Sequence, residues 1–188
     1  TATADTSSAA DQTLLFANGL GGFTLDGREY VLTLHGRERP PAPWSNVLAN
    51  PGFGTLITEA GAGYTWAGNA QMNRLTPWSN DPVADPPGEA LYLRDEETGE
   101  FWSPTPGPCG GDATTVVRHG QGYTRFTRTS HGVDQDLLVF VSATDPVKLI
   151  RLRVSNTGAR PRRLSATFYV EWVLGVLREQ AALNVLCT

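Results

Sequence analysis

The sequence LLVFV at residues 137–141 is apolar at every position. A strand with one face in water alternates apolar and polar side chains, whereas a strand covered on both faces is apolar at consecutive positions. These five residues therefore predict a central strand between two layers rather than an edge strand. Two layers of strands packed face to face form a β-sandwich, and a closed barrel is the less favoured alternative.

Three hairpin patterns precede this stretch, over residues 23–34, 53–66 and 91–102. In the first, apolar and polar side chains alternate on both sides of an Asp26-Gly27 pair, and Asp-Gly favours the tight turn of a β-hairpin. The other two turn at segments that contain glycine. Three consecutive hairpins predict an antiparallel sheet.

Strand patterns continue in the second half of the chain. They cover residues 114–119, 123–129, 133–141, 147–154 and 164–174. In the last of these, LSATFYVEWVL, every second side chain from Leu164 to Leu174 is apolar, which predicts one buried face and places Trp172 in the core. About nine strands joined by short turns indicate an all-β fold, an antiparallel β-sandwich.

Composition narrows the classes of function. The chain has 188 residues with 20 Gly and 13 Pro, which favours many turns over long helices. Its net charge of -4 gives no broad attraction for nucleic acid or anionic membranes, so we expect no nucleic-acid partner. No run reaches the roughly 18 apolar residues of a membrane helix. Cys109 and Cys187 have neither metal-site nor disulfide-framework spacing.

We expect one domain. Residues 1–12 are small and polar and are interpreted as a flexible lead-in, and residues 13–188 contain no stretch typical of a domain linker. Residues 183–188 stop in mid-pattern, with no Gly, Pro or polar tail to close an element. The sandwich domain over residues 13–188 is therefore expected to be incomplete at its C-terminal end.

The segment least typical of strands is AQMNRLTPWSNDPVADPPGE, at residues 70–89. Its four prolines restrict the backbone and lower the entropy cost of holding polar side chains in one geometry. A rigid polar loop of this kind is a candidate binding site. The alternative is an Ω-type loop, in which Asx side chains bond to their own backbone and Trp78 covers an edge of the core.

Carbohydrate recognition needs flat aromatic faces for the apolar side of a sugar ring and nearby amides or carboxylates for its hydroxyls. Tryptophans lie close to asparagines at three places: Trp44 and Asn46, Trp66 and Asn69, and Trp78 and Asn80. The candidate substrate-binding residues lie in and beside the loop: Trp66, Asn69, Arg74, Trp78, Asn80 and Asp81. The alternative for any one tryptophan is a buried position with its indole N–H hydrogen-bonded.

A carboxylate pair for glycoside chemistry could be drawn from five acidic residues: Glu59, Asp81, Asp85, Glu89 and Glu171. An inverting pair needs carboxyl groups about 6.5 to 9.5 Å apart, a distance that a sequence does not give. Asp81 and Asp85 each precede a proline, which favours a structural role in turns. We assign no catalytic residue, metal site or cofactor, because the histidines are scattered and no hydrolase or nucleotide-binding motif occurs.

Several stretches resemble one known family. They are NGLGGFTLDGREYVL (18–32), TPWSNDPV (76–83), YLRDEETGEFWSPT (92–105), HGQGY (119–123) and DPVKLIRLRVSN (145–156). In this order they are similar to the phosphorylase-like region of bacterial cyclic β-1,2-glucan synthases and, more distantly, to cellobiose and chitobiose phosphorylases. The resemblance covers almost the whole chain after the lead-in.

The resemblance implies an N-terminal β-supersandwich domain, which in that family precedes a helical linker and an (α/α)-barrel catalytic domain. The family's general acid is an aspartate of the barrel, so the resemblance implies no catalytic residue here and an inactive isolated chain. It implies three partners: a β-glucan or another glucose-containing oligosaccharide, the catalytic barrel of the same polypeptide, and a second copy in a homodimer. It also implies a bacterial protein in the cytoplasm, as part of an inner-membrane protein.

Two functions remain open at this point. The first is a non-catalytic β-sandwich domain of a β-glucan-processing enzyme, either a cyclic β-1,2-glucan synthase (a glycosyltransferase) or an inverting β-glucoside phosphorylase. Such a domain would support the catalytic barrel, dimer contacts and substrate positioning. The second is an independent carbohydrate-binding module. A self-contained hydrolase that uses Asp81 is a third and less favoured interpretation.

Overall fold

The computed structural model describes residues 13–181, 183 and 185. Its strands are β1 (Gly21–Phe23), β2 (Glu29–Leu34), β3 (Ser45–Asn50), β4 (Phe53–Thr58), β5 (Gly63–Ala67), β6 (Glu89–Asp95), β7 (Phe101–Trp102), β8 (Thr115–Gly120), β9 (Tyr123–Ser130), β10 (Val133–Val141), β11 (Lys148–Asn156) and β12 (Leu164–Val170), followed by the short helix α1 (Arg178–Ala181). The paired strands are antiparallel, so the predicted all-β, antiparallel fold is confirmed.

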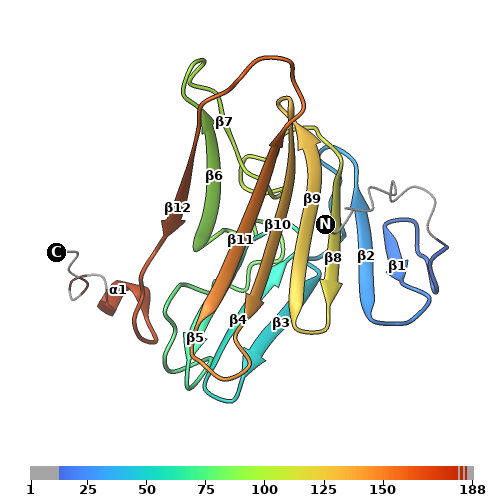
Figure 1. Cartoon of the computed structure of the whole chain (residues 1–188). Coiled ribbons are helices and arrows are strands. Elements are labelled where there is room, and N and C mark those ends of the chain that lie inside the picture. Colours follow the sequence, from blue (N-terminus) through green and yellow to red (C-terminus); the bar gives the residue numbers. More distant parts are fainter. Residues whose placement is uncertain (1–12, 182, 184, 186–188) are drawn as a thin grey trace.

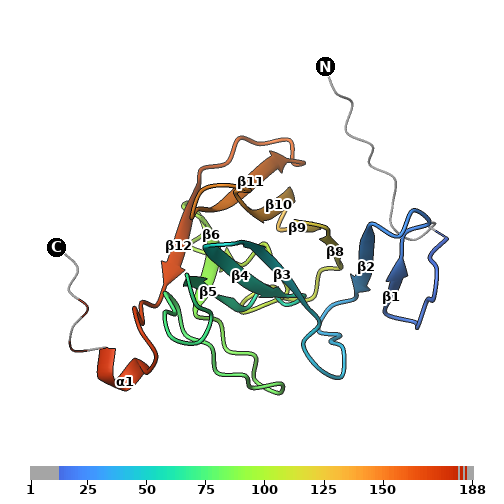
Figure 2. The ribbon, with the colours of Figure 1, turned by 90° about the horizontal axis from the view of Figure 1, so that it is seen from below.

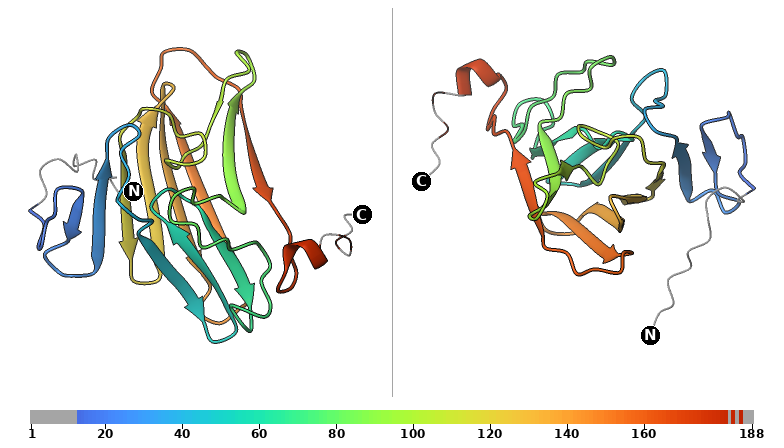
Figure 3. Two further views of the ribbon diagram at one scale, coloured as in Figure 1. Left: turned by 180° about the vertical axis from the view of Figure 1, so that it is seen from behind. Right: turned by 90° about the horizontal axis from the view of Figure 1, so that it is seen from above.

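The strands form two layers. A six-stranded sheet in the order β1-β2-β8-β9-β10-β11 makes the first layer (Figure 1). Two three-stranded sheets, β3-β4-β5 and β12-β6-β7, lie against one face of this curved sheet (Figures 2 and 3). The three predicted hairpins are present as β1–β2, β4–β5 and β6–β7. At the first of them Gly27 has φ 68°, a backbone conformation that glycine adopts without strain.

The core lies between the layers. Its larger cluster consists of Leu32, Leu34, Leu48, Ile57, Val117, Phe126, Leu137 and Val139. A second cluster, Leu93, Trp102 and Val133, lies where β6 and β7 face β10. The indole Nε1 of Trp102 donates a hydrogen bond of 3.0 Å to Gln135, which satisfies the only polar atom of this buried side chain.

Strand β10 contains the LLVFV stretch and lies inside the six-stranded sheet, as predicted. Leu137 and Val139 are buried against the second layer, whereas Leu138 and Phe140 on the opposite face are half-buried. No layer of the described residues covers that outer face, so the interior position is confirmed but the predicted cover on both faces is wrong. The cross-strand neighbours of Leu138 are Arg125 and Arg151, and their long aliphatic stems can cover apolar surface while the charged ends remain in water.

The prediction that one face of residues 164–174 is buried is wrong for the described part of the chain. Strand β12 ends at Val170, and the apolar side chains of Phe168, Trp172 and Leu174 are 46%, 45% and 52% exposed. The reason is that β12 is an edge strand that pairs only with β6, and no described layer packs on it. Alternation predicted the strand, but it could not predict whether anything covers the apolar face.

Strand β3 was not predicted. Its sequence, SNVLAN, carries asparagines at two positions that face away from bulk solvent, so the apolar alternation is weak. Asn46 donates to the carbonyl oxygens of Gly120 and Tyr123 at 2.9 Å each, and Asn50 donates to those of Ser142 and Asp145. These amides tie β3 to the β8–β9 and β10–β11 hairpins of the six-stranded sheet, in addition to the apolar contacts of Leu48.

Two sequence predictions, the lead-in over residues 1–12 and the role of Cys187, lie outside the described residues. Within the described part of the chain, no helix has the length and hydropathy needed to cross a membrane.

Candidate functional site

The proline-rich loop between β5 and β6 begins by running back along β5. The amide of Leu75 donates to the carbonyl oxygen of Thr65 at 2.8 Å, and Arg74 pairs with Trp66 on one side and with Gly175 on the other. The loop therefore extends the β3-β4-β5 sheet before it turns away. This backbone pairing fixes the position of Trp78, four residues further on.

An aromatic cluster forms where the loop meets β5. The Tyr64 ring lies 5.1 Å from the Trp78 ring in a stacked arrangement and 5.1 Å from the Trp66 ring in a tilted one. The guanidinium carbon of Arg74 lies 6.0 Å from the centre of the Tyr64 ring, within the range of a cation–π contact. Three predicted residues, Trp66, Arg74 and Trp78, are thus brought together.

Tyr64 is the member of this cluster that sequence reasoning missed. It lies two positions before Trp66 in β5, and residues two apart in a strand point to the same face. Trp66 and Trp78 are both half-buried, because their rings pack on Tyr64 and on the sheet. Their partial exposure leaves aromatic surface open to a ligand.

Trp66 lies directly over Gly54 on the neighbouring strand β4. A Cβ atom added to Gly54 would lie 2.3 Å from the indole Cζ2, far inside contact distance. Only glycine at this position lets the indole lie flat on the sheet.

The other three predicted residues shape the loop. Asn69 accepts hydrogen bonds through Oδ1 from two backbone amides of the following turn, at 2.9 and 2.8 Å. Asp81 does the same through its own Oδ1, at 2.9 and 3.0 Å, and these hydrogen bonds hold the pKa of this exposed carboxyl below its usual range. Asn80 is exposed and has φ 50°. These contacts are those of the alternative Ω-type loop.

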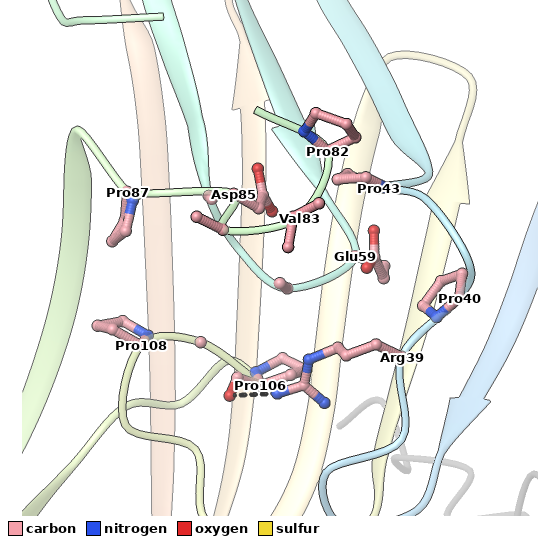
Figure 4. Close-up of a pocket in the computed structure, with 14 residues that line it drawn as sticks. Arg39, Pro40, Pro43, Glu59, Pro82, Val83, Asp85, Pro87, Pro106 and Pro108 are labelled. Carbon is pink, nitrogen blue, oxygen red and sulfur yellow. Dashed lines mark hydrogen bonds between the residues drawn. The ribbon is translucent and has the colours of Figure 1, made fainter. Parts of the chain in front are cut away.

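A pocket of about 350 Å³ lies at the far end of the same loop (Figure 4). Six prolines line it: Pro40, Pro43, Pro82, Pro87, Pro106 and Pro108. The charged side chains among its lining residues are Glu59, Asp85 and Arg39. Because proline rings have few accessible conformations, the walls of this pocket are stiff.

Glu59 follows β4 directly and is only 2% exposed. Its Oε2 accepts a hydrogen bond of 2.8 Å from the amide of Trp44, and its own amide donates to the Trp44 carbonyl at 3.0 Å. Burial is the main cause that raises the pKa of Glu59 to about 7; the nearby charge of Asp85 adds to it, and hydrogen bonds from backbone amides and the charge of Arg39 oppose it. The carboxyl is thus divided between its two protonation states near neutral pH.

Asp85 and Arg39 complete the polar lining. Asp85 accepts a hydrogen bond of 2.7 Å from the Thr58 hydroxyl, and burial raises the pKa of its carboxyl. Arg39 extends below both carboxyl groups and donates to the carbonyl oxygens of Pro106, at 2.9 Å, and Glu38, at 2.7 Å (Figure 4). Of the five acidic candidates, Glu59 and Asp85 are the two that line this pocket together.

The remaining acidic candidates have partners elsewhere. Glu89 is buried between the layers, where its carboxylate meets the ammonium group of Lys148 at 2.6 Å and accepts from the hydroxyl groups of Thr65, at 2.5 Å, and Thr76, at 2.8 Å. Glu171 pairs with Arg178. Neither carboxylate faces the pocket.

Comparison with known proteins identifies relatives of this chain. A family model described as glycosyl hydrolase 94, supersandwich domain, matches residues 28–185. The chain is 41% identical over 172 residues to the cyclic β-(1,2)-glucan synthase NdvB of Rhizobium meliloti (strain 1021), with 91% of this chain covered. It is 37% identical over 155 residues to an N,N'-diacetylchitobiose phosphorylase of Vibrio furnissii, with 81% of this chain covered. It is 32% identical over 162 residues to a solabiose phosphorylase of Paenibacillus borealis, with 83% of this chain covered.

These relatives are much longer than this chain. It spans 6% of the length of the Rhizobium protein, 19% of the Vibrio protein and 20% of the Paenibacillus protein.

Proposed function

The chain belongs to the glycosyl hydrolase 94 supersandwich family, and from this we propose that it is the non-catalytic β-sandwich domain of a β-glucan-processing enzyme. The observation that carries the proposal is the family match over residues 28–185, together with a two-layer antiparallel fold over the same residues. The full-length enzyme would be a cyclic β-1,2-glucan synthase or an inverting β-glucoside phosphorylase. Its reaction would take place in a separate catalytic barrel.

Contact with further protein is part of this proposal. An exposed apolar rim supports it, formed by β11, β12 and the segment that follows: Leu149, Ile150, Phe168, Tyr169, Trp172, Leu174, Val176 and Leu177. Large contiguous apolar surfaces on soluble proteins mark interaction sites. We assign this rim to packing against the remainder of the sandwich, the catalytic barrel or a second copy of the enzyme.

The aromatic cluster is our candidate for substrate positioning. Half-buried aromatic rings beside an arginine can hold the apolar face of a sugar while the guanidinium group donates to its hydroxyls. The full-length enzyme that carries Trp78→Ala is expected to lose about tenfold or more in kcat/KM for its oligosaccharide substrate. The control is Phe101→Ala, which removes an exposed ring from β7 instead. Unchanged kinetics together with an unchanged oligomeric mass would rule out this role for the loop.

The same cluster supports a second candidate function, an independent carbohydrate-binding module. A titration of the isolated chain with a short β-1,2-glucan, followed by tryptophan fluorescence, separates the two. A saturable change that Trp78→Ala abolishes would favour the binding module. No change in a folded chain would favour a role that needs the rest of the enzyme. A cytoplasmic location, within an inner-membrane protein, belongs to the first proposal.

A further inference from the structure

The pocket around Glu59 differs from the other places where this chain buries a carboxylate. Within the described residues, three carboxylates are buried: Glu59, Glu89 and Asp95. Glu89 has an ion pair with Lys148, and Asp95 has one with Arg162. No basic side chain of the described part of the chain makes an ion pair with Glu59. A buried carboxylate without a cation is costly, so its retention calls for an explanation.

Arg39 is the basic residue in the lining of this pocket, and its hydrogen bonds explain why it does not form an ion pair with Glu59. The guanidinium group lines the pocket but donates to the carbonyl oxygens of Pro106 and Glu38, and it makes no ion pair with Glu59. Asp85 adds a second negative charge to the lining. The lining therefore holds two carboxyl groups and one guanidinium group, and the guanidinium group is hydrogen-bonded to backbone carbonyl oxygens.

The shape of the pocket favours an occupant with a flexible apolar stem and a charged end. Six of its fourteen lining residues are prolines, whose rings offer C–H surface but no hydrogen-bond donors. A volume of about 350 Å³ is at the lower end of the range for ligand sites. The stems of lysine and arginine are apolar, and their charged ends form hydrogen bonds with carboxylates. A neutral sugar of the same size would add no positive charge to a lining that holds two carboxyl groups and one guanidinium group.

We propose that this pocket binds the side chain of a lysine or arginine that projects from a protein surface packed over Pro40, Pro82 and Pro106. The charged end lies between the carboxylates of Glu59 and Asp85, and the stem packs on the proline rings. The source of this side chain rests on the proposed function, because we assign it to the part of the full-length enzyme that covers this face. The pocket's preference for a cation does not rest on that function.

A matched pair of small probes tests that preference. The isolated chain is titrated at pH 8 with Nα-acetyl-arginine methylamide and, separately, with the citrulline counterpart, which has the same shape without the charge. Backbone amide NMR signals of Ala60, Ala84 and Gly107 report binding. We expect saturable shifts with a Kd in the millimolar range for the arginine probe and about tenfold weaker binding for the citrulline probe.

Variants assign the effect to the carboxylate. Glu59→Gln is expected to weaken the arginine probe by about tenfold or more, because it keeps the acceptor for the Trp44 amide and removes the charge. Glu179→Gln on α1 removes the same charge elsewhere and should leave the affinity unchanged. Equal binding of both probes, saturable binding of glucose in their place, or no saturable shift with the arginine probe would overturn the proposal.

A stability measurement guards against a purely structural role for Glu59. If the carboxylate awaits an external cation, Glu59→Gln raises the Tm of the isolated chain at pH 8. If the carboxylate is needed by this fold itself, the same variant lowers the Tm, and the proposal is wrong. Neither readout depends on enzyme activity, so the failure of this proposal is distinguishable from the failure of the proposed function.

Discussion

A buried carboxylate destabilises the folded chain unless a cation or hydrogen-bond donors compensate for its lost hydration. Burial alone would raise the pKa of Glu89, but the charge of Lys148 and three hydrogen-bond donors bring it below the usual value. At Glu59 burial prevails, and the pKa is about 7. The ionised form is therefore favoured by the fold at Glu89 and disfavoured by it at Glu59.

The pH dependence of stability follows from the raised pKa of Glu59. Because the folded state holds the proton more tightly than the unfolded chain, the contribution of Glu59 is most favourable below pH 4.5 and is lost as pH rises to about 7. The free energy of unfolding of Glu59→Gln should therefore exceed that of the unsubstituted chain at pH 8, by up to about 3 kcal/mol. At pH 5 the difference should be much smaller.

Urea denaturation at both pH values measures this difference, and Glu179→Gln serves as the control for the loss of a negative charge. A difference between Glu59→Gln and the unsubstituted chain that does not change with pH would contradict the raised pKa.

Individual elements show how far sequence reasoning reached. The Asp26-Gly27 turn and the LLVFV stretch predicted a hairpin and an interior strand, because backbone conformation and apolar pattern are local properties. Strand β3 was missed because asparagines tie it to distant loops. Three of the six predicted site residues meet at Tyr64, but the pocket draws on four separate segments. No spacing in the sequence could predict that Glu59 and Asp85 line the same pocket.

The contact between β4 and β5 yields a test at this scale. Gly54→Ala places a methyl group inside the indole of Trp66, so the ring must move off the sheet and away from Tyr64. Such overpacking is expected to lower the free energy of unfolding by about 1–3 kcal/mol and to shift the tryptophan fluorescence. Gly52→Ala is the control, because the nearest atom to its added Cβ lies 4.0 Å away. Equal stability of the two variants would show that the indole does not lie over Gly54.

At the scale of the whole molecule, exposed apolar side chains gather along two of the edge strands. Strands β11 and β12 are the edges of their sheets, and apolar side chains of both are exposed. Exposed edge strands with apolar side chains favour pairing with other chains. The isolated chain should therefore associate with itself as its concentration rises.

Sedimentation velocity over a range of concentrations checks this expectation. The double variant Phe168→Ser, Leu174→Ser should shift the population toward monomer, because it removes apolar side chains from the rim. Val47→Ser, which removes an exposed apolar side chain from β3, should not. A monomer at every concentration for the unsubstituted chain would contradict the assignment of the rim as an interaction surface.

The pairing of β2 with β8 also limits the order in which the strands can pair during synthesis. Glu29 pairs with Gly120 and Leu34 with Thr115, so the β1–β2 hairpin joins its sheet only through residues made much later in synthesis. Strand β3 pairs with β4 and β4 pairs with β5, so this sheet can form while β8 is still in the ribosome. Closing the loop between β2 and β8 carries a large entropy cost, and folds of high contact order are slow to form. The β1–β2 hairpin therefore leaves the ribosome before β3, β4 and β5 but waits longer than they do for its neighbour.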